Sequence, residues 1–207
     1  MPENLHKLFV ISSPSGGGKT SLINKLFEDL RSTNFEKSIS DTSRQKRQGD
    51  QEGKDYYFLS EKDFKEKIKK EEYVEYATVF GNFYGTSKNE IKTKYNNSNL
   101  VLELDWQGAY AVKKLFDDAK LIFIVPPSLD DLKHRLIKRN LDSSESIENR
   151  LSEAKKEISK SEMYDFLVLN DDFDRAFEDL SQILFKGISS KDFNSRVSKD
   201  LIERLVE

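Results

Sequence analysis

The segment Ser13-Pro14-Ser15-Gly16-Gly17-Gly18-Lys19-Thr20 is well suited to chemistry on a phosphate group. It matches the pattern G-x-x-x-x-G-K-[ST] except at its first position, where serine replaces glycine. Consecutive glycines let backbone N–H groups turn toward an anion, and a helix N-terminus adds positive potential. In such a loop Lys19 reaches the β- and γ-phosphates, and the Thr20 hydroxyl is a ligand for Mg²⁺. The Gly-Lys-Thr ending favours a nucleotide-phosphate site over an ordinary glycine-rich turn.

Charged residues at two other places add candidate contacts to a phosphate or a metal ion. Arg44 and Arg47 lie three residues apart, so they could clamp a second phosphate, although a solvated basic loop has the same composition. Asp105 ends an apolar segment that predicts a strand, and a carboxylate there is suited to organising Mg²⁺ or its waters. Glu103, two residues earlier on the same strand face, is the lower-ranked candidate.

Strands alternate with helices along most of the chain and provide a framework for these residues. Short apolar segments predict strands at residues 8–11, 100–105, 121–125 and 166–169. Apolar residues at helical spacing predict a helix after each strand, near residues 19, 109, 128 and 173. This order predicts an α/β fold with a parallel sheet flanked by helices, and the phosphate-loop motif between the first strand and the first helix makes it a P-loop NTPase core.

Two segments depart from this alternation. Residues 37–95 contain short aromatic groups separated by glycines, which predict a small, mostly-β insertion with one helix near residues 60–70. Residues 139–144 are polar, lie between two predicted helices and predict a short lid. The end of the chain, residues 188–207, has apolar residues at a spacing of four. That pattern fits a helix docked on its own domain or on a second copy, and equally a frayed extension.

Composition excludes several classes of protein. The formal net charge of −3 leaves no basic excess for nonspecific binding to nucleic acid. The sequence has no cysteine and only 2 histidines, which excludes disulfide frameworks, thiolate zinc sites and multi-histidine metal centres. The longest apolar run, residues 121–125, is too short to span a bilayer, and the N-terminus has no signal-peptide pattern. We therefore expect a cytoplasmic protein that binds neither nucleic acid nor membranes.

A series of motifs, taken together, resembles the guanylate kinase family. The motifs occur in that family's order and spacing and cover nearly all of the chain except its C-terminal end. They are Ser12 to Thr20, Ser40-Asp41-Thr42-Ser43-Arg44-Gln45-Lys46-Arg47, Gly53-Lys54-Asp55-Tyr56, Glu75-Tyr76-Ala77, Gly81-Asn82-Phe83-Tyr84-Gly85-Thr86, Asp105-Trp106-Gln107-Gly108 and Asn170-Asp171-Asp172-Phe173-Asp174. The resemblance implies transfer of the ATP γ-phosphoryl group to GMP with Mg²⁺, giving ADP and GDP in purine nucleotide metabolism.

The resemblance also implies roles for individual residues. The implied ATP-binding residues are Ser13, Pro14, Ser15, Gly16, Gly17, Gly18, Lys19, Thr20, Ser21 and Asn170. The implied catalytic residues are Lys19, Arg135, Arg139 and Arg150. The implied GMP-binding residues are Ser40, Arg44, Arg47, Tyr56, Glu75, Tyr84, Thr86 and Asp105. Thr20 and Asp105 are the implied Mg²⁺ ligands, the latter directly or through water.

Guanine has a donor pattern that explains the implied base contacts. Its N1–H and 2-amino group lie side by side, and a carboxylate accepts from both, while a hydroxyl donates to O6. By the resemblance Glu75 is this carboxylate, and Ser40 and Thr86 carry the hydroxyls. Adenine would leave the carboxylate unpaired, and polar sites of this kind discriminate by roughly 10⁴-fold.

The resemblance implies a single domain over residues 1–207. Its core is 5–36 and 96–186, its GMP-binding insertion 37–95 and its lid about 139–144. Two other functions stay open at this point: a catalytically inactive protein-binding scaffold, and a kinase that uses another phosphorylated acceptor. A homo-oligomer is compatible with the sequence.

Overall fold

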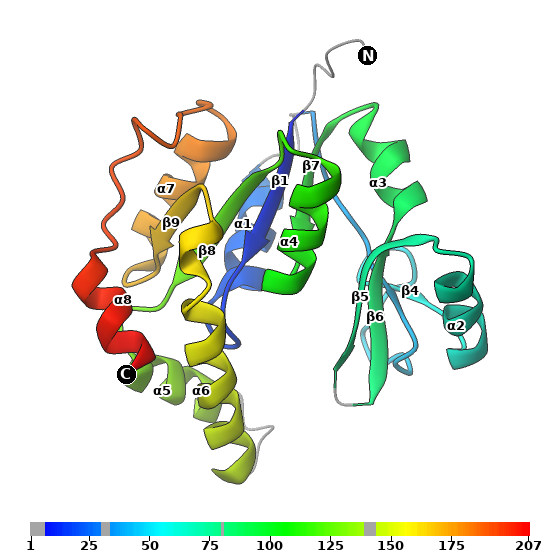
Figure 1. Cartoon of the computed structure of the whole chain (residues 1–207), viewed down its shortest axis with the longest axis horizontal. Coiled ribbons are helices and arrows are strands. Elements are labelled where there is room, and N and C mark those ends of the chain that lie inside the picture. Colours follow the sequence, from blue (N-terminus) through cyan, green and yellow to red (C-terminus); the bar gives the residue numbers. More distant parts are fainter. Residues whose placement is uncertain (1–6, 30–33, 80, 139–143) are drawn as a thin grey trace. The chain divides into compact units, whose positions relative to one another are not determined.

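We describe a computed structural model of the chain, which covers residues 7–29, 34–79, 81–138 and 144–207 (Figure 1). The strands are β1 (Leu8–Ser12), β2 (Phe35–Lys37), β3 (Asp41–Thr42), β4 (Tyr57–Phe58), β5 (Tyr73–Val79), β6 (Asn82–Ser87), β7 (Asn99–Glu103), β8 (Lys120–Val125) and β9 (Phe166–Leu169). The helices are α1 (Lys19–Asp29), α2 (Glu61–Lys69), α3 (Lys88–Tyr95), α4 (Trp106–Leu115), α5 (Leu129–Lys138), α6 (Ser144–Ile158), α7 (Phe173–Leu184) and α8 (Lys199–Val206). A short 3₁₀ helix, Ser161–Met163, precedes β9.

The larger sheet has five strands in the order β2-β7-β1-β8-β9. The pairs β2–β7, β1–β8 and β8–β9 are all parallel. Every residue of β1 is buried, as is typical of a strand covered on both faces by helices. The predicted parallel α/β core is therefore confirmed.

The chain divides into two compact units, which we describe separately. The insertion unit comprises the described residues within 1–8, 34–102 and 107–119, so it contains the whole described part of the predicted insertion. The loop unit comprises the described residues within 9–33, 103–106 and 120–207 and contains the glycine-rich loop.

The smaller sheet lies in the insertion unit and has the strand order β4-β3-β6-β5. Helix α2 covers one of its faces through Phe64, which is 0% exposed and stacks on the rings of Tyr73 and Phe83 at centroid distances of 4.5 and 5.3 Å. On the same face, the Asp41 carboxylate pairs with Lys67 of α2 and accepts a 2.8 Å hydrogen bond from the Tyr73 hydroxyl. This packing leaves the opposite face of the sheet for other contacts.

The insertion contains two helices, where the sequence predicted one. The predicted helix is α2, which Ser60 caps by accepting from the Asp63 N–H. The second is α3, which Ser87 caps in the same way. Helix α3 escaped prediction because it is short and lysine-rich, so its buried Ile91 and Tyr95 make only a weak apolar stripe.

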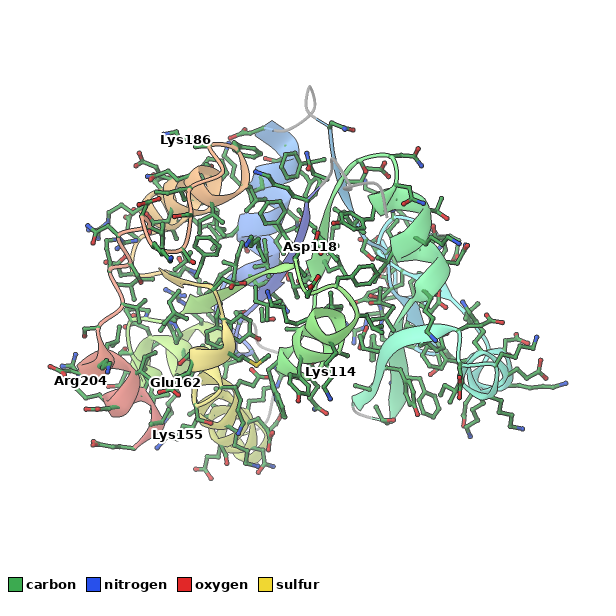
Figure 2. All side chains as sticks on the ribbon, turned by 45° about the horizontal axis from the view of Figure 1, so that its top comes forward. Lys114, Asp118, Lys155, Glu162, Lys186 and Arg204 are labelled. Carbon is green, nitrogen blue, oxygen red and sulfur yellow. The ribbon has the colours of Figure 1, made fainter. Side chains whose placement is uncertain are left out.

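The loop unit is built around β8, which is buried from Leu121 to Val125. Its last helix, α8, packs against α6 and buries Leu205. Charged side chains such as Glu162, Lys186 and Arg204 are exposed on this unit (Figure 2). Among the described residues, none of the helices is both long and apolar enough to cross a bilayer.

Candidate functional site

The glycine-rich loop joins β1 to α1 in the loop unit. Gly16 and Gly18 have φ values of +85° and +92°, a region that other residues rarely adopt. A 2.8 Å hydrogen bond from the Gly17 N–H to the Pro14 carbonyl closes the turn, and the Ser13 hydroxyl donates to the same carbonyl at 3.1 Å. The loop therefore reverses the chain within a few residues and delivers it to the N-terminus of α1, as an anion site requires.

Close packing against the loop also requires glycine. A Cβ atom at Gly18 would lie 2.3 Å from the Asn170 side-chain nitrogen, and one at Gly17 would lie 2.9 Å from the Pro14 carbonyl oxygen. Asn170 is 5% exposed, and its Nδ2 donates a 2.7 Å hydrogen bond to the Gly17 carbonyl. The resemblance assigned Asn170 to ATP binding; in the structure its side chain holds the loop itself.

The first two residues of α1 meet the end of β7. The Lys19 ammonium donates to the Leu104 carbonyl at 3.1 Å, and the Thr20 hydroxyl donates to Glu103 Oε1 at 2.6 Å. Glu103, the lower-ranked carboxylate, is thus the one that contacts Thr20. The main-chain carbonyl of Asp105 accepts a 3.4 Å hydrogen bond from the Ser12 hydroxyl. Two carboxylates and the Thr20 hydroxyl therefore come from the segments next to the loop.

Trp106 follows Asp105 in the sequence and has a charged neighbour. Trp106 begins α4, and the Lys160 ammonium lies 5.7 Å from the centroid of its ring. This is a cation–π contact. The indole thus follows a predicted metal ligand directly in the chain.

Glu157, on α6, is a half-buried residue at this site that the sequence analysis did not single out. Burial raises its pKa to about 7, and the charge of Asp105 acts in the same direction. The Lys19 charge and a hydrogen bond from the Ser15 N–H oppose this rise. Its Oε2 atom is buried and has no hydrogen-bond partner among the described residues. The sequence could have indicated its burial, because Glu157 lies between Ala154 and Ile158, two apolar residues that are buried on α6.

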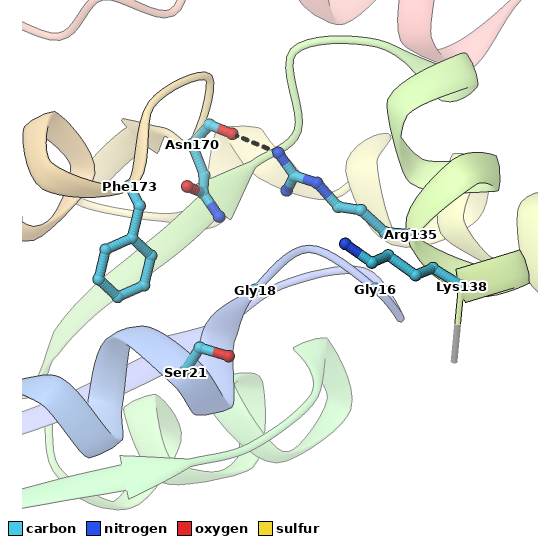
Figure 3. A pocket seen from close by; sticks show the side chains of 7 residues that line it. All are labelled: Gly16, Gly18, Ser21, Arg135, Lys138, Asn170 and Phe173. Atoms are coloured by element: carbon cyan, nitrogen blue, oxygen red, sulfur yellow. Dashed lines mark hydrogen bonds between the residues drawn. The ribbon is translucent and has the colours of Figure 1, made fainter. Parts of the chain in front are cut away.

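A pocket of about 390 Å³ opens beside the loop (Figure 3). Its lining residues are Gly16, Gly18, Ser21, Arg135, Lys138, Asn170 and Phe173. Arg135 donates to the Asn170 carbonyl at 3.0 Å, and it reaches toward the loop from α5 together with Lys138. The pocket thus combines loop backbone, two cations and one aromatic ring, a set suited to a nucleotide.

Lys138 and Phe173 were not predicted as site residues. Phe173 was placed in a helix and in the last of the family motifs without a role of its own, but its side chain is 39% exposed and lines the pocket. The missed signal was its position just after a strand, because ligands bind beyond the carboxyl ends of parallel strands.

Of the other predicted catalytic arginines, Arg150 is not among the residues that line this pocket. Arg150 lies on α6 and is half-buried. Arg139, like most of the predicted lid, lies outside the described residues.

The insertion unit brings together the residues predicted to read a base. In the antiparallel pair β5–β6, Glu75 lies opposite Thr86, so both side chains project from the same face. Tyr84, two residues before Thr86, shares that face, which is opposite the one that α2 covers. The Ser40 and Thr86 hydroxyl oxygens are 3.3 Å apart. Two hydroxyls and a carboxylate therefore lie on one side of the sheet, where Thr86 is 0% exposed and Ser40 and Glu75 are half-buried.

Arg44 is fixed by an acidic and an aromatic partner. Its guanidinium pairs with Asp50 at 2.8 Å and lies 5.5 Å from the centroid of the Tyr56 ring. Asp50 also accepts a 2.8 Å hydrogen bond from the Arg47 N–H. This backbone bond, together with the Arg44 charge, lowers the pKa of Asp50 below its ordinary value. Tyr56 in turn meets Tyr84 edge to face at 5.7 Å.

The loop unit offers part of a ligand set for Mg²⁺, which substrate phosphates would complete. The described residues contain no group of three or more His, Cys, Asp or Glu side chains that could hold a metal alone. Protein-bound Mg²⁺ is commonly held by one or two carboxylates plus substrate phosphates. The Thr20 hydroxyl, hydrogen-bonded to Glu103 at 2.6 Å, with Asp105 two residues farther on, supplies such a partial set.

Comparison with known proteins gives a consistent result. Residues 5–187 match the family model described as "Guanylate kinase". A "Guanylate kinase" of Wolbachia sp. subsp. Brugia malayi is 46% identical over 89% of this chain and 94% of its own length. One from Coxiella burnetii is 41% identical over 99% of this chain and 98% of its own. The crystal structure of guanylate kinase from Anaplasma phagocytophilum superposes with a TM-score of 0.70 and 34% identity, covering 90% of this chain and 88% of that one.

Proposed function

Because this chain belongs to the guanylate kinase family, we propose that it transfers the γ-phosphoryl group of ATP to GMP, giving ADP and GDP, with Mg²⁺. The single observation that carries the proposal is the loop geometry. Gly16 and Gly18 have positive φ, and Lys19 and Thr20 follow at the first turn of α1. The acceptor assignment is supported by Glu75, which lies opposite Thr86 in the insertion sheet.

In this proposal the loop unit binds the triphosphate of ATP. Backbone N–H groups of Gly16 and of Gly18 to Thr20 surround the phosphates, and Lys19 exchanges its hydrogen bond to the Leu104 carbonyl for phosphate oxygens. Arg135 and Arg150 add charge where it is spread over the γ-phosphoryl oxygens. Bound Mg²⁺ would neutralise phosphate charge, and Thr20, Glu103 and Asp105 are the residues that would hold it or its waters.

The insertion unit binds GMP. Glu75 accepts hydrogen bonds from the guanine N1–H and 2-amino groups, and the Ser40 and Thr86 hydroxyls donate to O6. The side chains proposed to hold the GMP phosphate are Arg44, Arg47, Tyr56 and Tyr84. Asp50 and Tyr56 support this by fixing Arg44, whose side chain is only 11% exposed. We propose that residues 37–95 form the GMP-binding insertion, and that a lid at 139–144 contributes Arg139.

No general base is needed for the transfer, because the attacking GMP phosphate oxygen is already an anion. The residues act by holding donor and acceptor in line and by stabilising the charge of the transferring group. Removal of one such arginine lowers the rate by roughly 10³- to 10⁵-fold in related phosphoryl-transfer enzymes.

The experiment that tests this function is an acceptor comparison. ADP formation is measured from ATP and Mg²⁺ with GMP, AMP, CMP, UMP or dTMP supplied separately. We expect strong turnover with GMP alone. Turnover with another nucleotide would keep the phosphate-loop assignment and overturn the role of Glu75. A protein that binds ATP but turns over none of the five would be a scaffold or a kinase for another acceptor.

A further inference from the structure

The end of the chain, residues 188–207, lies beyond the part that matches the family model. One residue of this segment, Arg196, reaches back to the strand–helix connection that carries Asn170. We infer that Arg196 is a positioning residue for ATP: it fixes Asn170, and through Asn170 the glycine-rich loop. This inference rests on the proposed function.

Arg196 holds the chain on both sides of Asn170. Its Nη1 atom lies 2.6 Å from Asp171 Oδ1, just after Asn170. Its Nη2 atom donates to the Leu169 carbonyl, just before Asn170, at 2.9 Å. One planar guanidinium thus fixes the direction of the main chain at both ends of a single residue, which a point charge such as lysine cannot do.

A third contact ties the same guanidinium to α7. Nη2 also lies 3.0 Å from Asp179 Oδ2, and the side chains of Arg196 and Asp179 are 28% and 16% exposed. Partly buried, charge-assisted contacts of this kind are stronger than exposed ion pairs.

The restraint on Asn170 passes directly to the loop. The Asn170 side chain donates to the Gly17 carbonyl at 2.7 Å, and the position of a Cβ on Gly18 would lie 2.3 Å from the same nitrogen. The Asn170 carbonyl, in turn, accepts the bond from Arg135 that forms one wall of the pocket (Figure 3). A rotation of Asn170 would therefore disturb the loop backbone and Arg135 together.

Anchoring of the C-terminal segment does not account for Arg196, because other contacts already provide it. The Ser195 hydroxyl donates to the Leu167 carbonyl at 2.7 Å, and the Phe193 ring meets Phe166 edge to face at 5.7 Å. Farther on, Leu205 of α8 is 2% exposed. We therefore expect the segment to remain docked when the guanidinium is removed.

The test compares Arg196→Gln with Arg175→Gln in the full chain. Arg175 also pairs with Asp171, at 3.0 Å, but its side chain is 61% exposed. The dissociation constants for ATP with Mg²⁺ and for GMP are measured separately by calorimetry. NMR records the Asn170 side-chain amide and the Gly18 N–H signals, which a purely structural role would not move selectively.

We expect Arg196→Gln to weaken ATP binding about tenfold, as when the competent loop conformation falls to about a tenth of the population. It should also shift both NMR signals and leave GMP affinity unchanged. Arg175→Gln should leave all of these within about twofold, since exposed pairs contribute little. Arg196→Lys should restore part of the ATP affinity because it keeps the charge, and it replaces the glutamine variant if that variant does not fold.

Three results would count against the inference or against the function beneath it. Wild-type ATP affinity and unmoved signals in Arg196→Gln, with only a lower melting temperature, would overturn the positioning role. Equal losses of ATP and GMP affinity would also overturn it, because they indicate a global effect. If the wild-type chain bound no ATP, the proposed function would fail instead, and the Asn170 and Gly18 signals alone would decide whether Arg196 positions the loop.

Discussion

The loop unit and the insertion unit present their candidate ligand groups in different ways. In the loop unit the groups are mainly backbone, shaped by Gly16 and Gly18 at positive φ and packed tightly against Asn170. In the insertion unit they are side chains on one face of a sheet whose other face is packed against α2. A backbone site is part of the fold, so changes there should affect binding and stability together. A half-buried side chain such as Glu75 can be changed with less effect on the fold.

The largest expected effect tests this separability in the insertion unit. Glu75→Gln replaces one accepting oxygen with a donor that faces the guanine amino group. We expect kcat/KM for GMP to fall about 10³-fold. ATP affinity and the free energy of unfolding should stay unchanged, as calorimetry and urea unfolding would measure. Equal losses for both nucleotides would refute the base-reading role.

The corresponding test in the loop unit is Gly18→Ala, which should affect both properties. The added methyl meets Asn170 at 2.3 Å, and the backbone there has a φ of +92°. We expect a loss of about 3 kcal/mol in the free energy of unfolding, and ATP binding too weak to measure by calorimetry.

Gly49→Ala is the matched control for that substitution. Gly49 has a similar φ of +95°, but nothing lies within 4 Å of the added methyl. It should cost about 1 kcal/mol from backbone strain alone. A similar cost at both glycines would show that packing against Asn170 contributes nothing.

A third prediction concerns the loop unit and the dependence of the free energy of unfolding on pH. The pKa of Glu157 is about 7 in the folded chain, against an ordinary value of 4.5. The folded protein therefore holds a proton that the unfolded chain loses between these values, so the free energy of unfolding falls as the pH rises from 4.5 to 7. In Glu157→Gln this decrease should be absent. Between pH 4.5 and 7 the free energy of unfolding should therefore change by on the order of 2 kcal/mol less in the variant than in the wild type. Parallel wild-type and variant profiles in urea unfolding would contradict the assignment.

A small effect, of the same order as that of the Gly49→Ala control, is expected at the packed face of the insertion sheet. Asp41→Asn keeps the shape of the buried side chain but removes the charge that pairs with Lys67. We expect a loss of about 1 to 2 kcal/mol in unfolding free energy, with little change in KM for ATP. A large loss of ATP affinity would show that the two units are less separable than the comparison suggests.

The loop and the parallel core were predictable because their signals are local. Eight consecutive residues define the loop pattern, and the buried strands are short apolar runs such as Leu121 to Val125. The face of the insertion sheet was not readable from spacing alone, because it depends on the pairing of Glu75 with Thr86 across two strands. The family resemblance supplied those residues without their geometry.

Other features depend on tertiary packing that no local pattern encodes. Glu157 looks like one more charge in a polar helix until its neighbours bury it. Asn170 was assigned to the ligand, but its side chain donates to Gly17, more than a hundred residues away in sequence. Glu103 ranked below Asp105, yet its carboxylate, at the end of β7, accepts a hydrogen bond from Thr20. In each case the role of the residue depends on which distant segment packs against it, and a single sequence does not show that packing.

Trp106, the only tryptophan in the chain, gives this site a built-in optical reporter. It follows Asp105 directly, and the Lys160 ammonium lies 5.7 Å from the centroid of its ring. Excitation at the red edge of protein absorption selects this indole over the 8 tyrosines. Fluorescence emission therefore comes from one known position beside the phosphate loop, so occupancy there can be followed in real time without attaching a dye.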